Sequence, residues 1–459
     1  MAIGLCVIAF VITFVASLRS VVAGLVCAMA VGYGYGITRA NVLESASHFV
    51  FDAAVLGLYL GWIGSGVSNR HGRTVKLWMI LLIGWPVLVS LVPIQHPLIQ
   101  AVGLRGNVFF VPFLLLGASL DEQQVDRLAT WLAVLNLGAL VFAAAEYFKG
   151  VEPFYPLSPV TEIIYRSKDV SGFTAHRIPA CFANSASYGG VMAATIPWLV
   201  GAWIQPEQGI GKRWLLAAGI AAAIVGVFLS AFRSVAILLF VLMLVVTFSR
   251  QMRASLWLGW AAMLVIIGFV VSNENRLQRF TTLSDPDLVI GRVANSTNAG
   301  SWLELARDYP MGNGMGGGGT SIPYFLQDLV RNPIGMENEY SRIMLEQGIP
   351  GMLIWVTFII WALTRSLGNS DSPWYLGRRL LWYSAAFSCG SALIGTGMLT
   401  AIPGTALFLL GLGWITSSKS LSERGEAELE YDFTEVTSAD SALAGSMRYM
   451  GSFETTSTS

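Results

Sequence analysis

MAIGLCVIAFVITFVASLR, residues 1–19, opens the chain with an almost unbroken apolar run that ends at its first basic residue. An apolar run of about 18 residues or more is long enough to cross a bilayer as a helix. No basic segment precedes the run, and no small-residue cleavage site follows it. We therefore interpret it as a retained first span and not as a cleaved signal peptide.

The composition extends this pattern to the whole chain. Hydrophobic residues make up 54% of the 459 residues and charged residues only 12%, whereas a soluble protein has about 25% charged residues. The sequence predicts an all-α polytopic integral membrane protein with about 12–13 transmembrane helices and a large extracytoplasmic loop that contains short helices. The spans are predicted near 2–18, 20–37, 47–67, 77–94, 107–120, 128–147, 188–205, 214–230, 234–248, 255–272, 349–366, 380–397 and 399–416.

The remaining composition excludes several classes of protein. A formal net charge of zero argues against nucleic-acid binding. The four cysteines and four histidines are scattered and form no CxxC or HExxH motif, so neither a disulfide framework nor a metal site is indicated. We predict no metal and no cofactor.

Short basic loops set the expected orientation. They all fall on one side of the predicted spans, which the positive-inside rule assigns to the cytoplasm: residues 70–76, 211–213, 249–253 and 377–379. The N-terminus and the long loops 148–187 and 273–348 then face outward.

Three regions follow from this topology. Residues 1–187 form N-terminal spans that end in the first long loop, and residues 188–416 form a second transmembrane region that includes loop 273–348. Residues 417–459, rich in Ser, Thr and Glu, are predicted to be a disordered cytoplasmic tail.

Charged residues at membrane level indicate function. Arg233 lies in a turn between two spans, beside Ser230 and Ser234, and we expect it to face a carboxylate, a lipid phosphate or a substrate diphosphate. Snorkelling to headgroups is the alternative. Arg177 is a second cation at the outer surface. Asp52 lies in an apolar run, where it is either paired and functional or wetted at the mouth of its span.

The loop 273–348 contains the remaining candidates. NAGSWLELARDYP, residues 298–310, predicts a short amphipathic helix that Pro310 ends. The glycine run after it can cradle an anion with free N–H groups or can act as a hinge; the glycines concerned are Gly314, Gly316 and Gly317. Glu337 opens the next predicted helix, where it is either favoured by the helix dipole or acts as a general base near Arg292.

Four segments in this order resemble the O-antigen ligase and O-antigen polymerase superfamily of bacterial membrane glycosyltransferases. They are HRIPACFANSASYGG (176–190), LSAFRSVAILL (229–239), GRVANSTNAGSWLELARDYPMGNGMGGGG (291–319) and MENEYSRIMLEQGIPGMLIW (336–355). The last resembles a family segment that begins His-Asn-x-Tyr. Glu337 stands where family members often have histidine, which is the one clear departure.

The resemblance implies a metal-independent glycosyltransferase of the bacterial inner membrane, with its site facing the periplasm. Its partners would be a glycan donor on undecaprenyl or another polyprenyl diphosphate, a glycan or lipid-glycan acceptor, membrane lipids, and other proteins of lipopolysaccharide or exopolysaccharide assembly. Arg233 would stabilise the leaving diphosphate with Arg292, and Glu337 would activate the acceptor. The substrate-binding residues would be Arg177, Asn338, Tyr340, Gly314, Gly316 and Gly317.

Two rivals come from other classes. A transporter or flippase for polysaccharide or lipid-linked oligosaccharide would show repeats and charged residues near mid-membrane. The sequence shows no clear repeat, and its charge is expected outside the spans, which favours an enzyme. A membrane-anchored assembly protein is the second rival, and it would not need arginines at membrane level.

Overall fold

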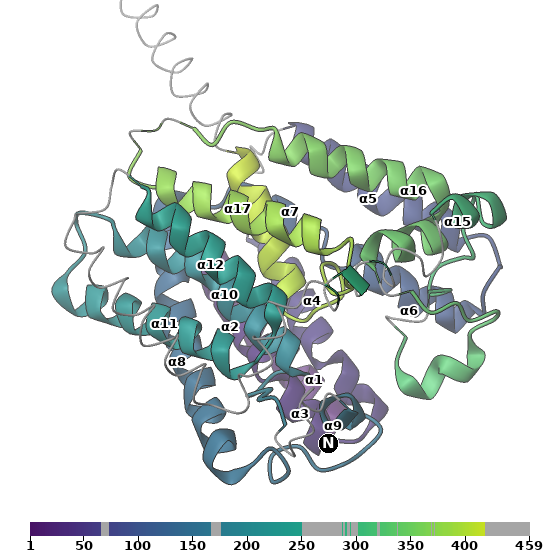
Figure 1. Cartoon of the computed structure of the whole chain (residues 1–459), viewed down its shortest axis with the longest axis horizontal. Coiled ribbons are helices and arrows are strands. Elements are labelled where there is room, and N and C mark those ends of the chain that lie inside the picture. The colour runs from purple at the N-terminus through teal and green to yellow at the C-terminus, as the bar shows by residue number, and fades with distance from the viewer. Residues whose placement is uncertain are drawn as a thin grey trace, which may run out of the picture.

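The computed structural model describes residues 1–65, 73–166, 176–249, 302–318, 322–336, 338–368 and 372–417, with the single residues 287, 290, 291, 294 and 370. Within these residues every helix or strand element is a helix, which confirms the predicted all-α class (Figure 1). Predictions for residues 250–286, which include the predicted span 255–272 and the start of the long loop, for Arg292 and Glu337, and for the tail after Ser417 lie outside the described part.

The first half of the chain forms a long series of helices. They are α1 (Ala2–Arg19), α2 (Val21–Tyr33), α3 (Tyr35–Asn41), η1 (Ser45–Phe49), α4 (Val50–Gly64), α5 (Arg73–Ser90), α6 (Pro97–Val108), α7 (Phe113–Ser119), α8 (Glu122–Lys149) and α9 (Glu162–Arg166). The second half contains α10 (Ser185–Trp203), α11 (Ile210–Leu229), α12 (Arg233–Thr247), α15 (Trp302–Asp308), η3 (Tyr324–Leu329), α16 (Glu339–Leu363), α17 (Tyr375–Ser391) and a last helix, Gly404–Ser417.

Seven of the described helical segments are long and apolar enough to cross a membrane, or eight if the bent pair α2–α3 is one span. The predicted count was higher for identifiable reasons. α12, α17 and the last helix are shorter than 18 residues, α10 is not apolar enough to qualify, and the predicted span 255–272 lies outside the described part. The predicted span 107–120 is also displaced, because α6 and α7 together form one stretch over 97–119.

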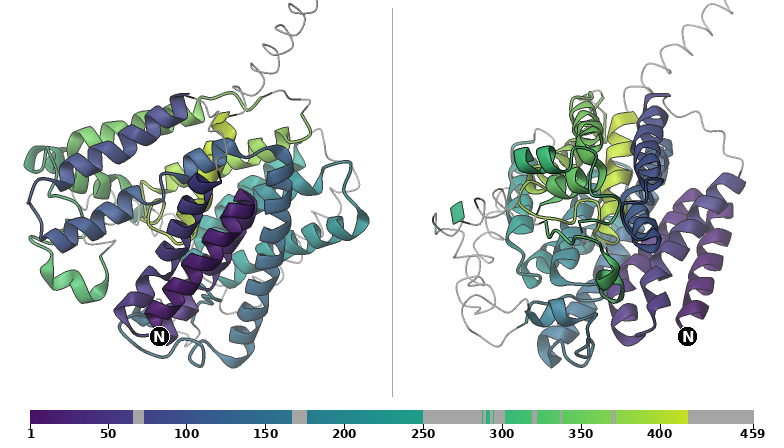
Figure 2. Two further views of the ribbon diagram at one scale, coloured as in Figure 1. Left: turned by 180° about the vertical axis from the view of Figure 1, so that it is seen from behind. Right: turned by 90° about the vertical axis from the view of Figure 1, so that its right-hand side faces the viewer.

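Small residues let the first helices approach closely, as in other membrane helix pairs. A Cβ on Gly57 of α4 would lie 2.4 Å from the Phe10 oxygen of α1, and one on Gly61 would lie 2.6 Å from the Ser17 Cβ. The Ser17 hydroxyl donates to the Leu58 carbonyl at 2.9 Å. The residue numbers of α1 and α4 increase in the same direction along this contact, so the two helices run parallel (Figure 2).

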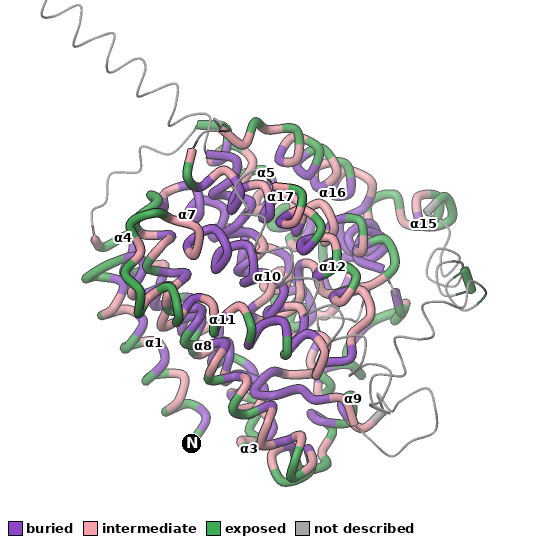
Figure 3. Tube along the Cα trace, turned by 60° about the vertical axis from the view of Figure 1, so that its left-hand side comes forward, coloured by how far each residue is buried: buried purple, intermediate pink, exposed green. Residues whose placement is uncertain are grey.

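α10 lies at the centre of the bundle and is buried along most of its length, whereas α1 leaves one apolar side exposed (Figure 3). The exposed side chains of α1 are Ile3, Val7, Ile8, Val11, Ile12, Val15 and Leu18. An apolar face of this kind is expected where lipid replaces water as the surrounding solvent.

α8 connects the two ends of the bundle. Near its start, Asp126 accepts from Gln208 at 2.6 Å and pairs with Lys212. Near its end, Glu146 accepts from the Ala180 N–H at 2.9 Å. We call the end with Ala180 the loop end; it also holds the N-terminus and residues 150–166, since Asn41 donates to Phe154 (Figure 1). The opposite end is the basic end.

The described parts of the short basic loops gather at the basic end. Arg378 lies 3.7 Å from Glu122, close to the Lys212 pair on the same helix. α5 begins at Arg73, and its Trp78 packs on Trp361 of α16, toward the end of that helix. The grouping agrees with the predicted topology, although the structure contains no membrane to orient it.

Candidate functional site

α16 begins where the sequence predicted a helix. Asn338 is its N-cap, and its side-chain oxygen accepts from the Ser341 N–H at 2.7 Å. Asparagine is a favoured N-cap because this bond satisfies one of the free N–H groups of the first turn. The helix continues to Leu363 across a break at Gly348, and the predicted span start at residue 349 coincides with that break.

The bend in α16 occurs at Gly348, whose φ of 71° and ψ of −173° are accessible essentially to glycine alone. The segment after α15 lies in this bend. The Ile349 N–H donates to the Pro310 oxygen at 2.9 Å, and the Asn313 N–H donates to the Leu345 oxygen at 2.6 Å. The interrupted helix therefore satisfies its backbone groups by taking in a neighbouring loop, as broken helices in membrane proteins must.

The first turns of α16 contain a fully buried charge network. Arg342 lies between Glu339 and Glu346, and all three side chains are completely buried. The guanidinium donates to Glu339 Oε1 at 2.6 and 3.0 Å and to Glu346 Oε2 at 2.7 Å. Glu339 Oε2 accepts from the Gly397 N–H at 2.8 Å, so both of its oxygens have partners.

α6 supplies a second layer to this network. Asn107 donates to Glu346 Oε2 at 2.8 Å and accepts from Arg342 at 3.2 Å and from Gln347 at 2.9 Å. Trp85 of α5 donates to the Gln347 carbonyl at 2.9 Å. The network thus joins α5, α6 and α16 through polar groups that satisfy one another, and this arrangement makes their relative positions specific.

The glycine loop packs against the same elements. Gly314 and Gly316 have φ near +80°, and a Cβ on Gly103 of α6 would lie 2.2 Å from the Gly316 nitrogen. The N–H of Gly317 donates to the Gly314 oxygen at 3.0 Å, within the loop. A Cβ on Gly318 would lie 3.2 Å from Glu346 Oε1. The glycines therefore allow close packing on α6 and α16, and an anion-binding role for them stays a prediction.

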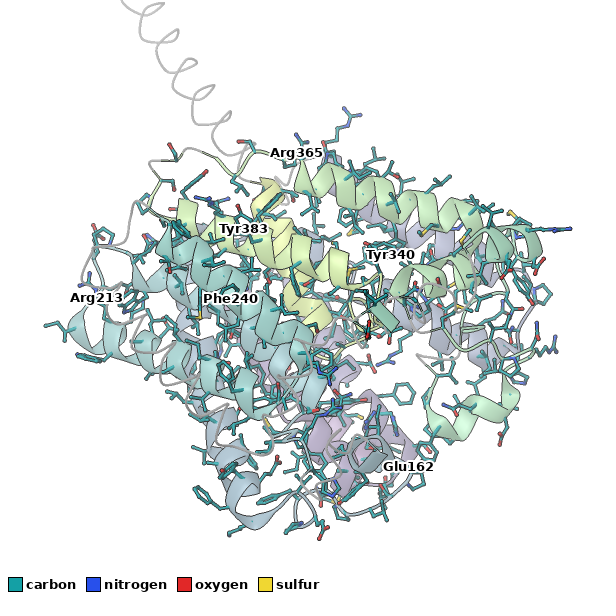
Figure 4. The ribbon with its side chains drawn as sticks, viewed as in Figure 1. Glu162, Arg213, Phe240, Tyr340, Arg365 and Tyr383 are labelled. Carbon is teal, nitrogen blue, oxygen red and sulfur yellow. The ribbon has the colours of Figure 1, made fainter. Side chains whose placement is uncertain are left out.

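The predicted residues of α16 are buried beside α17. Asn338 is completely buried, and the Tyr340 hydroxyl donates to the Cys389 oxygen at 3.0 Å, which places Tyr340 between the two helices (Figure 4). Glu337 and Arg292 lie outside the described residues, so their predicted roles stay predictions.

The two remaining predicted cations lie at the loop end. Arg233 is the first residue of α12, directly after a turn in which Ser230 packs against Gly189 of α10. Arg177 lies seven residues before Asn184, the N-cap of α10. Its Nε is shielded from solvent and has no hydrogen-bond partner among the described residues.

Two further arginines lie at this end. Arg105 pairs with Asp52 through bonds of 2.6 to 3.0 Å, which decides between the two interpretations of Asp52: it is paired. Arg39 lies over the ring of Tyr35, and its Nε is also shielded without a partner in the described part of the chain. The loop end thus combines cations from α3, α6, α12 and the segment before α10.

Buried side chains hold the segment from Arg177 to Asn184 in place. The Tyr155 hydroxyl donates toward the oxygens of Ala180 and Phe182, at 2.6 and 2.8 Å. Burial raises the pKa of Tyr155 well above its ordinary value. It also raises the pKa of the Cys181 thiol to about 12, to which the Glu146 carboxylate adds. Both groups are therefore neutral at physiological pH and serve to position the segment.

Sequence reasoning missed the buried network, although a signal was present. Glu339, Arg342 and Glu346 are spaced i, i+3 and i+7, which places all three on one helical face. Residues 339–346 were assigned to the loop, so their charges were expected outside the spans, whereas they begin a helix that is long and apolar enough to cross a membrane. Asn107 gave no local signal, because its partners are more than 230 residues away.

No known protein family and no characterised protein shows significant similarity to this sequence. Among the described residues, no group of three or more His, Cys, Asp or Glu side chains is arranged to hold a metal ion.

Proposed function

We propose that this protein is a membrane glycosyltransferase that transfers or polymerises glycan from a polyprenyl-diphosphate donor onto an acceptor sugar. The gathering of arginines at the loop end carries the proposal. Arg39, Arg177 and Arg233 come from separate segments, and two of them have shielded Nε atoms without a partner in the described residues. Arginine stays charged and binds phosphate oxygens through two bonds at once.

The proposed reaction is a displacement at the anomeric carbon. The bond from that carbon to the diphosphate oxygen breaks, the acceptor hydroxyl forms the new glycosidic bond, and the hydroxyl proton passes to Glu337. Arg233, with Arg292 and Arg177, stabilises the negative charge that develops on the leaving diphosphate. Asn338 and Tyr340 support the segment that carries Glu337, because they fix the start of α16.

The proposed location is the bacterial inner membrane, with the loop end facing the periplasm. The short basic loops lie at the opposite end of the bundle, where the positive-inside rule expects the cytoplasm. A lipid-linked donor would then reach the arginines from the outer leaflet.

The test compares lipid-linked and surface glycans in cells with the protein, cells without it and cells with Arg233→Ala at matched membrane abundance. Arg331→Ala, an exposed arginine, serves as the control. Accumulation of a single lipid-linked repeat in both defective strains identifies a polymerase. Accumulation of long lipid-linked chains that never reach their anchor identifies a ligase. Normal glycan in the Arg233→Ala strain contradicts the arginine-centred mechanism.

One observation favours a second candidate, a transporter of lipid-linked oligosaccharide. The buried Glu339–Arg342–Glu346 network lies inside a candidate span, and α2 and α3 form a pair bent by 45°. Buried charges and broken helices are typical of transporters. Purified protein with lipid-linked donor and acceptor in detergent separates the two, because an enzyme forms product there and a transporter does not.

A further inference from the structure

The charges of the buried network do not balance. Two carboxylates, Glu339 and Glu346, share the single guanidinium of Arg342, and all three side chains are completely buried. The other described side chain bonded to Arg342 and Glu346 is the amide of Asn107, which also accepts from Gln347, and neither amide carries a charge. If both carboxylates were ionised, the network would carry one uncompensated negative charge, which is costly inside a protein.

The surplus is localised at one atom. Both oxygens of Glu339 accept hydrogen bonds, from Arg342 and from the Gly397 N–H. Glu346 Oε2 accepts from Arg342 and Asn107. Glu346 Oε1 is buried and no described side chain donates to it; the one polar group near it in the described chain is the Gly318 backbone N–H, which does not reach hydrogen-bond geometry. This oxygen points toward the backbone of Gly318, at the end of the glycine loop.

We propose that Glu346 Oε1 binds one monovalent positive charge, either a proton or an alkali-metal ion. Either ligand removes the surplus charge and satisfies the one carboxylate oxygen that the network leaves open. Gly318 suits this position because it has no side chain to fill the space beside Oε1. The site is independent of the proposed transferase activity, since it follows from the charge balance of α16 alone.

The titratable and charged groups facing Glu346 in the described chain limit the interpretation of its pH dependence. Arg342 and Glu339 lie on the same helix, α6 contributes only the amide of Asn107, and the glycine loop contributes backbone at Gly318. If a proton is the ligand, the folded state binds one more proton than the unfolded state at neutral pH. Its stability then falls as the pH rises.

The test measures the melting temperature of the purified full chain in detergent from mildly acidic to mildly alkaline pH. Each series is recorded in choline, sodium and potassium chloride at equal ionic strength. Wild type is compared with Glu346→Gln, whose neutral amide keeps an oxygen toward Arg342 and Asn107. Glu346→Ala reports removal of the whole group, and Glu207→Gln, on an exposed loop, is the matched control.

A proton ligand is indicated if the melting temperature of wild type falls by several degrees with rising pH in every salt and that of Glu346→Gln does not. An alkali ion is indicated if sodium or potassium raises the melting temperature of wild type above its value in choline, with no such rise in Glu346→Gln. Parallel curves for the two proteins under all conditions would overturn the proposal. Failure of Glu346→Gln to fold would contradict a proton ligand, because an ionised carboxylate would then be required. The salt series of wild type then decides alone, and equal melting temperatures in choline, sodium and potassium chloride would overturn the proposal.

Discussion

Arg342 has the most demanding environment of any described side chain, since it is a completely buried cation with a carboxylate on each side. Removing one partner from a buried ion network leaves uncompensated charge and costs about 3–5 kcal/mol. We therefore expect Arg342→Leu to lower the stability of the folded protein by about that amount. The loss should appear in the melting temperature and in the yield of monodisperse protein.

Arg331→Leu is the control for this change, because Arg331 is exposed and its guanidinium hydrogen-bonds, within the described chain, only to the Ile94 oxygen at 3.4 Å. Its cost should be within about 0.5 kcal/mol. Equal stability of both variants would show that the buried guanidinium does not hold α16 together.

Cys181 allows a test of the loop end at the level of a single thiol. Its pKa of about 12, raised by burial, keeps the thiolate scarce at about pH 8. The thiolate is the reactive form. At pH values below the pKa, its fraction increases about tenfold for each unit by which the pH rises. In a variant with the other three cysteines replaced by alanine, we expect maleimide to modify Cys181 about a thousandfold more slowly than an ordinary thiol.

The control for the thiol measurement is the same variant unfolded in denaturant, where labelling should be complete within minutes. Rapid labelling of the folded protein would contradict the burial of the segment that Tyr155 holds in place. The rate should also rise steadily with pH across the alkaline range.

At the level of elements, the bend of α16 is the feature on which the network depends. Gly348 has a backbone conformation that costs other residues about 1–3 kcal/mol, and an added Cβ would lie 2.6 Å from the Pro310 oxygen. Gly348→Ala should therefore displace the 310–313 segment and lower the melting temperature clearly. Gly335→Ala, where a Cβ meets nothing within 4 Å, should have little effect.

The sequence predicted individual helices better than the contacts between distant segments. Apolar length placed most spans, and the helices at residues 302–308 and 339 onward were expected from local signals at Pro310 and Asn338. The continuation of α16 through Pro350 was not predictable from local rules, because a loop that is distant in the sequence supplies the lost backbone bonds. Asn107 was missed for the same reason, because its hydrogen bonds to the network join two different helices, α6 and α16.

At the level of the whole molecule, polar features separate toward two ends of an apolar bundle. Lys212, Arg213 and Arg378 lie at the basic end, and Arg39, Arg105, Arg177 and Arg233 lie at the loop end. Glu162 and Arg365 lie on opposite sides of the molecule in the same way (Figure 4). The predicted topology rests on the first set and its short loops. In the second set, Arg177 lies in the long loop 148–187, whereas Arg39, Arg105 and Arg233 lie in helices.

The orientation of these ends across the membrane can be measured directly. In a cysteine-free variant, Glu152→Cys introduces a thiol at the loop end and Glu207→Cys one at the basic end, and both positions are exposed. A membrane-impermeant maleimide applied to spheroplasts should label Glu152→Cys at once and Glu207→Cys only after permeabilisation. The physical reason is that positively charged short loops are retained in the cytoplasm during insertion. The reverse pattern would place the arginines of the loop end in the cytoplasm, where a donor in the outer leaflet could not reach them, and the proposed transferase would then have to be abandoned.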